Sequence, residues 1–404
     1  MTGAISFSRI VLVSYVPFFI WTFLGGHKQL FFGFSSDHIT ILMAFVSASL
    51  SLLLVRSVSK EELNIVLLFI AIYFFYCLSV LIAPTPYLFV ARLIDHFVYM
   101  VISLGVAFFF KDRVATFLKM IAGAAVASAV VVVLAWLCLG LGSWGRVTIP
   151  VYTEGSFSYF PGGYETSADP NVLAFFLYVG AITLLYGFFD RRWAKLALAV
   201  VMFAGILTFS RSGFVSFFMA VVAYAFVLTA GWLGKGADFK ISISKLFVSL
   251  TIFAVAFFLV AQAVLAYFPL IKSRVFDYSS NSDRLQRLHY FIETGFVNPL
   301  RIIFGHGLGA TRESIDPHLF YLSVVYDTGL ISLMFVLFAI VWPVYRLFKI
   351  ASVKTAAYAA GVGVFFLTNA MFYWQVRTYY FVVALLFVLY LSASDSKKRS
   401  LKSI

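Results

Sequence analysis

The chain has 404 residues, of which 62% are apolar and only 12% are charged, and it contains 48 phenylalanines and 22 tyrosines. Because soluble domains carry about 25% charged residues, this composition excludes an ordinary soluble protein and indicates an integral membrane protein. The net charge of +13 comes mostly from basic loops between apolar runs. Because the chain has no soluble basic domain, a nucleic-acid partner is not expected. Both cysteines, Cys77 and Cys138, lie in apolar runs, where we expect core residues rather than a disulfide or a metal site.

Continuous apolar runs of about 20 residues predict spanning helices, and they favour an all-α polytopic protein over a β-barrel. The whole chain, 1–404, is then a single transmembrane domain. The first run lacks a small-residue cleavage site, so we expect a retained helix rather than a signal peptide. About twelve spans are predicted, at residues 8–25, 38–55, 63–82, 90–110, 120–141, 170–188, 195–210, 212–231, 244–268, 319–341, 355–372 and 377–393.

The basic residues of the short loops predict the orientation, because loops rich in Lys and Arg stay in the cytoplasm. Every second loop is basic, from "RSVSKEE" after the second span to the tail "DSKKRSLKSI". This alternation predicts that the N- and C-termini are both cytoplasmic. It also predicts two large external loops, a first one at 142–169 and a longer one at 269–318.

Arg211 stands in "TFSRSGFVSFF" and is almost all that divides the seventh span from the eighth. A cation at membrane depth costs about 2.5–3.5 kcal/mol or more unless a partner or water meets it. The loop alternation places this junction at or just below the outer face. Since the sequence around Arg211 offers no carboxylate, we expect this residue to bind an anionic group.

The loop 269–318 breaks the basic-inside pattern, because it is external and yet rich in Arg and Lys. Long loops without structure of their own tend to be functional. Within it, "SDRLQRLHYFIETGF" has an apolar stripe at helical spacing, which predicts a helix. Arg284 and Arg287 are three apart and therefore share one face of that helix.

The second half of this loop carries two histidines of interest. His306 lies in "GHGLG", which is a weak phosphate-binding signal and is equally typical of a structural turn. His318 follows Pro317 at the entrance to the tenth span. The external arginines, Arg301 among them, have an alternative explanation, since they can pair with nearby carboxylates or with lipid head groups.

The loop 142–169 reads "GSWGRVTIPVYTEGSFSYFPGGYETSAD" and is rich in Gly, Tyr, Phe and small polar residues. Aromatic faces and hydroxyl groups suit a sugar, and Arg146 and Tyr164 are candidate contacts. An ordinary interfacial aromatic belt is the alternative. At its end, Asp169 and Pro170 have the residue types of an N-cap and a first helical position.

Three motifs together resemble the bacterial O-antigen ligase and O-antigen polymerase superfamily of membrane glycosyltransferases. "TFSRSGFV" is similar to that family's Ser-Arg-Ser/Gly-Gly segment at the start of a span. "SDRLQR" followed by "NPLRIIFGHGLG" resembles its arginine-led helix and Gly-rich turn, and "PHLFYLSVVYDTGLISLMF" resembles its His-x-x-x-Leu segment. The resemblance covers about residues 140–345, and the order and spacing of the motifs make it specific.

The resemblance implies a GT-C-like fold in the bacterial inner membrane with its active site on the periplasmic side. Such proteins transfer a saccharide from undecaprenyl pyrophosphate to an acceptor hydroxyl, with inversion and without a metal ion or other cofactor. Carried onto this chain, Arg211 and Arg284 would clamp the pyrophosphate and His318 would act on the acceptor hydroxyl or the leaving group. Arg287 and Arg301 would assist. Guanidinium groups suit this role because they stay protonated and present forked donors to phosphate.

Several alternatives remain open at this stage. His306 is an alternative base to His318, and Leu319 stands where many relatives have a small polar residue, so acceptor contacts can differ. The motifs fit a polymerase of O-antigen, capsule or exopolysaccharide, which we favour, and also a ligase that transfers the glycan to lipid A core.

A transporter or flippase of lipid-linked sugar is the alternative from another class. Such a protein should carry a polar site near the middle of the membrane. In this chain the main group of ionisable residues within the spans is Arg92, Asp95 and His96, close to one end of the fourth span. The sequence therefore favours the glycosyltransferase.

Overall fold

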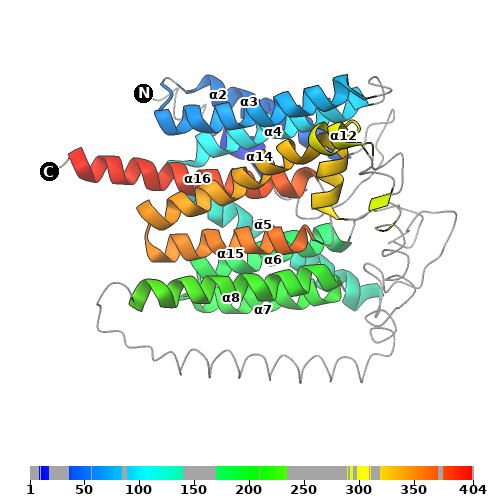
Figure 1. Cartoon of the computed structure of the whole chain (residues 1–404). Coiled ribbons are helices and arrows are strands. Elements are labelled where there is room, and N and C mark those ends of the chain that lie inside the picture. Colours follow the sequence, from blue (N-terminus) through cyan, green and yellow to red (C-terminus); the bar gives the residue numbers. More distant parts are fainter. Residues whose placement is uncertain are drawn as a thin grey trace.

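The computed structural model describes residues 9, 11–17, 36–55, 57–83, 89–139, 170–208, 210–233, 289, 292–293, 298–308, 310, 319–371 and 376–402. In this part of the chain every regular element is a helix, and the long helices lie side by side in one bundle (Figure 1). The helices are α2 (Ser36–Leu53), α3 (Lys60–Leu81), α4 (Val90–Phe110), α5 (Val114–Leu139), α6 (Pro170–Gly187), α7 (Arg192–Leu207), α8 (Arg211–Leu233), α12 (Pro299–Phe304), α14 (Phe320–Ile350), α15 (Val353–Asn369) and α16 (Val376–Lys402).

Among the described residues, ten of the twelve predicted spans coincide with helices, and the weakest boundary, at Arg211, is confirmed as a break between α7 and α8. Of the predicted span 8–25, residues 11–17 are described and helical, whereas the predicted span 244–268 lies outside the described residues. The total of twelve spans and the GT-C-like arrangement therefore remain predictions.

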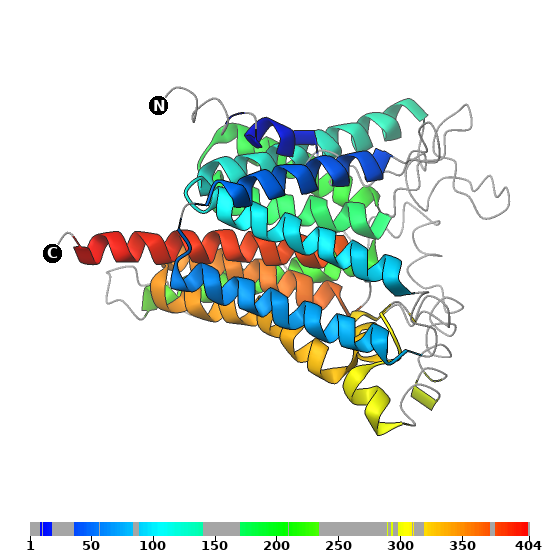
Figure 2. The same ribbon diagram turned by 90° about the horizontal axis from the view of Figure 1, so that it is seen from above.

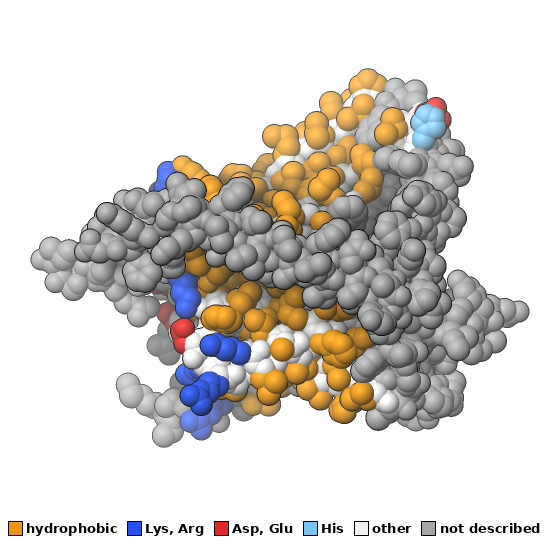
Figure 3. Space-filling view, turned by 90° about the horizontal axis from the view of Figure 1, so that it is seen from below, with side chains coloured by type: hydrophobic (Ala, Val, Ile, Leu, Met, Phe, Trp, Pro, Cys, Tyr) orange, Lys and Arg blue, Asp and Glu red, His pale blue; other side chains and the backbone are white. Residues whose placement is uncertain are grey.

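Six of the described helices are long and apolar enough to cross a membrane, namely α3, α4, α5, α8, α14 and α16. Large apolar side chains are exposed on their outer surfaces, for example Phe226 at 66% and Met334 at 65%, and apolar atoms cover much of the face in Figure 3. An exposed apolar surface of this extent is expected where lipid rather than water surrounds the helices. The protein is a multi-pass membrane protein.

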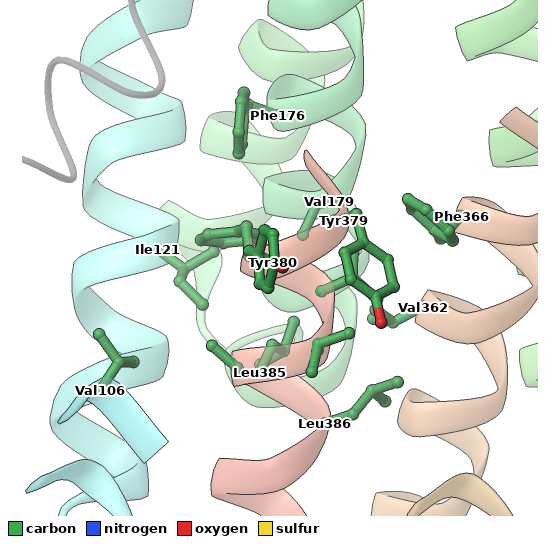
Figure 4. Packing of buried hydrophobic residues seen from close by; sticks show 14 of the residues in the cluster. Val106, Ile121, Phe176, Val179, Val362, Phe366, Tyr379, Tyr380, Leu385 and Leu386 are labelled. Carbon is green, nitrogen blue, oxygen red and sulfur yellow. The ribbon is translucent and has the colours of Figure 1, made fainter. Parts of the chain in front are cut away.

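The core lies around α16, whose residues from Tyr379 to Leu391 are all buried. Figure 4 shows Tyr379 and Tyr380 of α16 among side chains of the neighbouring helices. Elsewhere small residues let helices approach closely, as is usual in membranes. A Cβ on Gly361 of α15 would lie 3.3 Å from the carbonyl oxygen of Ala220 in α8, so these two helices pack backbone to backbone.

The two ends of the bundle differ in charge. Figures 1 and 2 show α12 (yellow) at one end and the C-terminal part of α16 (red) extending beyond the other. We call these the α12 end and the opposite end. Most described basic residues lie at the opposite end, and a group of blue Lys and Arg side chains is visible there in Figure 3. The described basic residues of this end are Lys60, Lys111, Arg113, Arg191, Arg192, Lys195, Lys349, Lys354 and Lys397.

A buried ion pair ties three segments together at the opposite end. Lys111, directly after α4, lies 2.7 Å from Glu62 of α3 and 3.8 Å from Asp395 of α16. Glu62 also accepts from the backbone N–H of Ser59, whose hydroxyl accepts from the Glu62 N–H, so that a capping box begins α3. Although partial burial opposes it, this pairing raises the pKa of Lys111 above its ordinary value.

Candidate functional site

The tenth predicted span, 319–341, is interrupted near its middle. The helix α14 contains Gly329 at φ 85° and ψ 169°, which separates residues 320–328 from a second helical part that reaches Ile350. A break leaves carbonyl groups without their helical donors, and a buried carbonyl without a partner is costly. The carbonyls of Tyr326, Asp327 and Thr328, just before Gly329, each accept a hydrogen bond from another donor.

Two of those donors come from the Gly-rich turn after α12, and one comes from α14 itself. The backbone N–H of His306 donates to the Tyr326 carbonyl over 2.7 Å, and the N–H of Gly307 donates to the Asp327 carbonyl over 3.0 Å. The Ser332 hydroxyl donates to the Thr328 carbonyl over 2.7 Å. The segment "GHG" therefore acts as a cap on the broken helix, so these two N–H groups serve the fold rather than an open phosphate cradle.

Two glycines make this contact close. Gly305 and Gly329 both have positive φ, at 83° and 85°, where a side chain would be strained. A Cβ on Gly305 would meet the carbonyl of Asp327, and a Cβ on Gly329 would meet the backbone of Ile303. Each glycine thus lies against the backbone of the other segment, and neither can be enlarged without separating α12 from α14.

His306 is held against α14 by its side chain as well as by its backbone. The imidazole stacks on the Tyr326 ring with centroids 4.0 Å apart and an interplanar angle of 13°. Its Nδ1 lies 3.2 Å from the Tyr326 carbonyl oxygen. Burial lowers the pKa of His306 below its ordinary value, the hydrogen bond to the Tyr326 carbonyl opposes this, and the positive charge of Arg301 lowers it further.

Arg301 is anchored by carbonyl oxygens. Its Nη1 donates to the Ile82 carbonyl after α3 over 3.2 Å and lies 3.5 Å from the Gly305 carbonyl. In the part of the chain that the structure describes, no carboxylate lies within ion-pair distance of Arg301. The sequence left open a pairing with nearby acids, and the described neighbours are carbonyls instead. Among the described residues, the other donors of the guanidinium have no hydrogen-bond partner, so they are candidates to bind an anion.

Arg211 is the first residue of α8, directly after a turn built from hydroxyl groups. Ser210 accepts from the Gly213 backbone N–H over 3.2 Å, an N-cap interaction that begins α8. The Ser210 hydroxyl also lies 3.0 Å from Asn171 Oδ1 in the first turn of α6 and 3.2 Å from Ser212 Oγ. The turn that carries Arg211 is therefore fixed to α6, at a helix N-terminus whose dipole favours anions.

The Arg211 turn and the α12 turn lie at the same end of the bundle. Gly361 faces Ala220 in the antiparallel pair of α15 and α8, so the end of α15 is level with the start of α8. The end of α15 in turn meets α14, because the Phe320 N–H donates to the Ala370 carbonyl over 3.0 Å. Among the described residues, α8 packs on α15, α15 packs on α14, and α14 packs on α12. Arg211 and Arg301 thus lie at the same end of the bundle.

The remaining predicted site residues lie outside the described part of the chain. These are His318, Arg284, Arg287, Arg146 and Tyr164, together with the whole loop 142–169 and most of the predicted helix at 282–296. Within that predicted helix, His289, Ile292 and Glu293 are helical, and His289 lies 3.3 Å from Glu293. Pro170 begins α6, as predicted, whereas its expected N-cap Asp169 is not described.

The ionisable group on α4 also lies at the α12 end. Arg92 and Asp95 form an exposed pair 3.5 Å apart. His96 is buried, with its Nδ1 3.3 Å from the Tyr380 hydroxyl and its ring edge-on to Tyr76, with centroids 4.7 Å apart. This histidine is held by aromatic residues of the core, as a structural residue is.

Sequence reasoning missed the partners that position these candidates. Tyr326 and the Ile82 carbonyl hold His306 and Arg301, and Asn171 holds the Arg211 turn. One signal was available, because a glycine inside the otherwise helical pattern "YDTGLISL" indicates a break or a close approach. The pairing of that break with the Gly-rich turn has no local signal.

The fold and the two differently charged ends define a multi-pass helical membrane protein. No family model matches the chain, and no curated protein matches it. A solved structure described as "Structural coordination of polymerization and crosslinking by a peptidoglycan synthase complex" contains a similar chain, with 17% sequence identity and a TM-score of 0.46. The match covers 82% of this chain and 97% of that one. A likeness this distant identifies neither the fold nor the function, so the resemblance to the O-antigen superfamily stays a prediction.

Proposed function

We propose that this protein is a membrane glycosyltransferase that works at the α12 end of the bundle. Its donor is a saccharide on undecaprenyl pyrophosphate, its acceptor is a glycan hydroxyl, and its product is a bacterial polysaccharide such as O-antigen, capsule or exopolysaccharide. The reaction inverts the anomeric centre and uses no metal ion. A ligase that takes lipid A core as its acceptor is the alternative within the same chemistry.

The observation that carries this proposal is the position of Arg301 in α12 and of His306 in the turn that directly follows this helix. Arg301 is a guanidinium whose described partners are all neutral carbonyls. His306 is an imidazole whose pKa is lowered by burial. A fixed cation beside a neutral base is the charge arrangement that breaking a sugar–phosphate bond requires. Such a pair at a membrane face suits a lipid-linked phosphate.

The charge asymmetry of the bundle supports an external position for this end. Described basic residues gather at the opposite end, which the positive-inside rule assigns to the cytoplasm. Periplasmic sugar transfer would then take place at the α12 end. In the inner membrane, Arg211 would bind the pyrophosphate at the N-terminus of α8, together with Arg284 and with help from Arg287.

In this mechanism the acceptor hydroxyl attacks the anomeric carbon of the donor sugar. The bond between that carbon and the phosphate oxygen breaks, and the undecaprenyl pyrophosphate leaves with the electron pair. The guanidinium groups stabilise the developing negative charge, and the acceptor proton passes to a histidine. His318 is the predicted base, at the entrance to α14.

The test uses the purified full chain in lipid nanodiscs with an undecaprenyl-pyrophosphate oligosaccharide as the probe. Products are resolved as glycan ladders, and released undecaprenyl pyrophosphate is measured. Arg211→Ala, Arg284→Ala and His318→Ala should each lower the transfer rate by about 100-fold or more. Arg192→Ala, at the opposite end, is the matched control and should keep the wild-type rate.

The products separate the alternatives. A ladder without added core establishes a polymerase, and a single product that needs lipid A core establishes a ligase. If the wild type transfers nothing to either acceptor but moves the lipid across the bilayer, the protein is a transporter and the proposal is wrong.

A further inference from the structure

The contacts of His306 determine which of its nitrogens can act as a base. The Tyr326 carbonyl oxygen can only accept a hydrogen bond, and Nδ1 of His306 lies 3.2 Å from it. Nδ1 must therefore carry the proton in the neutral ring, which leaves the lone pair on Nε2. The stacking on Tyr326 fixes the plane of the ring and hence the direction in which Nε2 can accept.

The surroundings of His306 favour the neutral ring, and they leave its other nitrogen without a partner among the described residues. Burial and the nearby Arg301 lower the pKa of His306, although the hydrogen bond to the Tyr326 carbonyl opposes this. Among the described residues of α14, the turn contacts the backbone carbonyls of two ionisable residues, Tyr326 and Asp327. Among the described residues, none hydrogen-bonds to Nε2, and the side chain is half-buried. Within the described residues, Nε2 is therefore available to accept a proton from a substrate.

Arg301 supplies the complementary charge on the same turn. Its guanidinium spans the first helical turn of α12 to reach both the Ile82 and the Gly305 carbonyls. Gly305 immediately precedes His306, so an anion on the outer edge of this guanidinium would lie close to the imidazole. A departing phosphate needs a cation beside it, which is Arg301 here. A hydroxyl nucleophile needs a base beside it, which is His306.

We propose that Nε2 of His306 accepts the proton of the attacking acceptor hydroxyl, with Arg301 facing the departing phosphate. This inference rests on the proposed function. The acceptor O–H bond breaks as its oxygen bonds to the anomeric carbon, and the proton moves to Nε2. The bond from that carbon to the phosphate oxygen breaks at the same time, and its electron pair leaves with the pyrophosphate. The imidazolium then returns its proton to water. His318 would in that case orient the acceptor rather than deprotonate it.

The experiment compares His306→Gln, His306→Ala and His318→Gln with wild type in nanodiscs, using the lipid-linked oligosaccharide as the donor. His289→Gln is the matched control, because that imidazole is 76% exposed and pairs with Glu293. His306→Gln should lower kcat by about 100- to 10,000-fold with little change in KM, and should remove the acidic limb of the pH–rate profile. Added imidazole should restore part of the rate of His306→Ala, which a structural defect would not permit.

A measurement that needs no turnover accompanies these assays. In wild type labelled with ¹⁵N-histidine, the His306 signals should show the Nδ1–H tautomer at pH 7 and titrate below pH 6.5. An Nε2–H tautomer, or transfer by wild type that His306→Gln leaves unchanged in rate and pH profile, overturns the role of His306 alone. Loss of the acidic limb in His318→Gln but not in His306→Gln does the same. Absence of any transfer by wild type overturns the proposed function itself.

Discussion

Substituting Gly329 by alanine should release the Gly-rich turn from α14 while leaving the bundle folded. At φ 85° and ψ 169°, a region that is essentially restricted to glycine, an added Cβ costs about 1–3 kcal/mol of backbone strain. The same Cβ would meet the backbone of Ile303 and Phe304, and overpacking of this kind costs about 1–3 kcal/mol. The two effects together amount to about 2–6 kcal/mol if the turn stays in place.

Release of the turn is the less costly response. It breaks the bonds from His306 and Gly307 to the carbonyls of Tyr326 and Asp327, and each such bond contributes about 0.5–1.5 kcal/mol net. Losing both therefore costs about 1–3 kcal/mol, less than keeping them against the clash. Because the turn is at the end of the bundle, water can take over the freed groups.

Hydrogen exchange measured by mass spectrometry in nanodiscs tests this reasoning. Amide protection in the peptide 301–308 should fall by about 30-fold or more in Gly329→Ala, which corresponds to about 2 kcal/mol. Gly123→Ala in α5 is the matched control, since no atom lies within 4 Å of the added Cβ there. Unchanged protection of 301–308 in Gly329→Ala, or an equal loss in Gly123→Ala, would refute the account of the break.

Three other perturbations should follow from described contacts. Protonation of His306 is disfavoured in the folded turn but not in the unfolded chain, so amide protection in the turn, taken relative to the intrinsic exchange rate at each pH, should fall as the pH drops below 6.5; unchanged protection between pH 7.5 and 5.5 would contradict the lowered pKa. Ser210→Ala removes the N-cap of α8 and should destabilise the protein by about 1–2 kcal/mol in thermal unfolding, whereas Ser128→Ala, at a buried hydroxyl without a partner among the described residues, should be close to neutral or stabilising. A double-mutant cycle of Glu62→Gln and Lys111→Met should give a coupling free energy of about 1–3 kcal/mol, and additive effects would show that the pair contributes nothing.

The helices were predictable because a membrane span is a local property of the chain. A run of apolar residues must bury its own backbone hydrogen bonds, so hydropathy alone locates it. The largest differences are helices longer than the apolar run: α5 begins at Val114 rather than at 120, and α14 continues to Ile350 rather than ending at 341. Helices continue into the polar region beyond the lipid, which hydropathy does not register.

The candidate site was predictable only in its residue types. Arginine in an apolar setting and histidine in a Gly-rich turn indicated function, and the structure gives Arg301 and His306 their neighbours. The pairing of Gly305 with Gly329 could not be predicted, since it depends on how two separate segments meet in space. The roles of Arg211, Arg284 and His318 stay predictions, because their side chains fall outside the described residues.

The capped break in α14 also bears on how the protein is made. The carbonyl of Tyr326 and its donors on His306 are separated by only 20 residues, so closing this loop costs little entropy. The cap, at residues 305–307, also precedes the break at Gly329 in the order of synthesis. Its donors are therefore already present when the broken helix enters the membrane. A lipid-exposed break would hold an unsatisfied backbone, which the bilayer does not tolerate. The α12 turn thus acts during insertion much as a chaperone built into the chain would, because the contacts that close it join residues 303–307 to residues 326–329 and involve neither α15 nor α16.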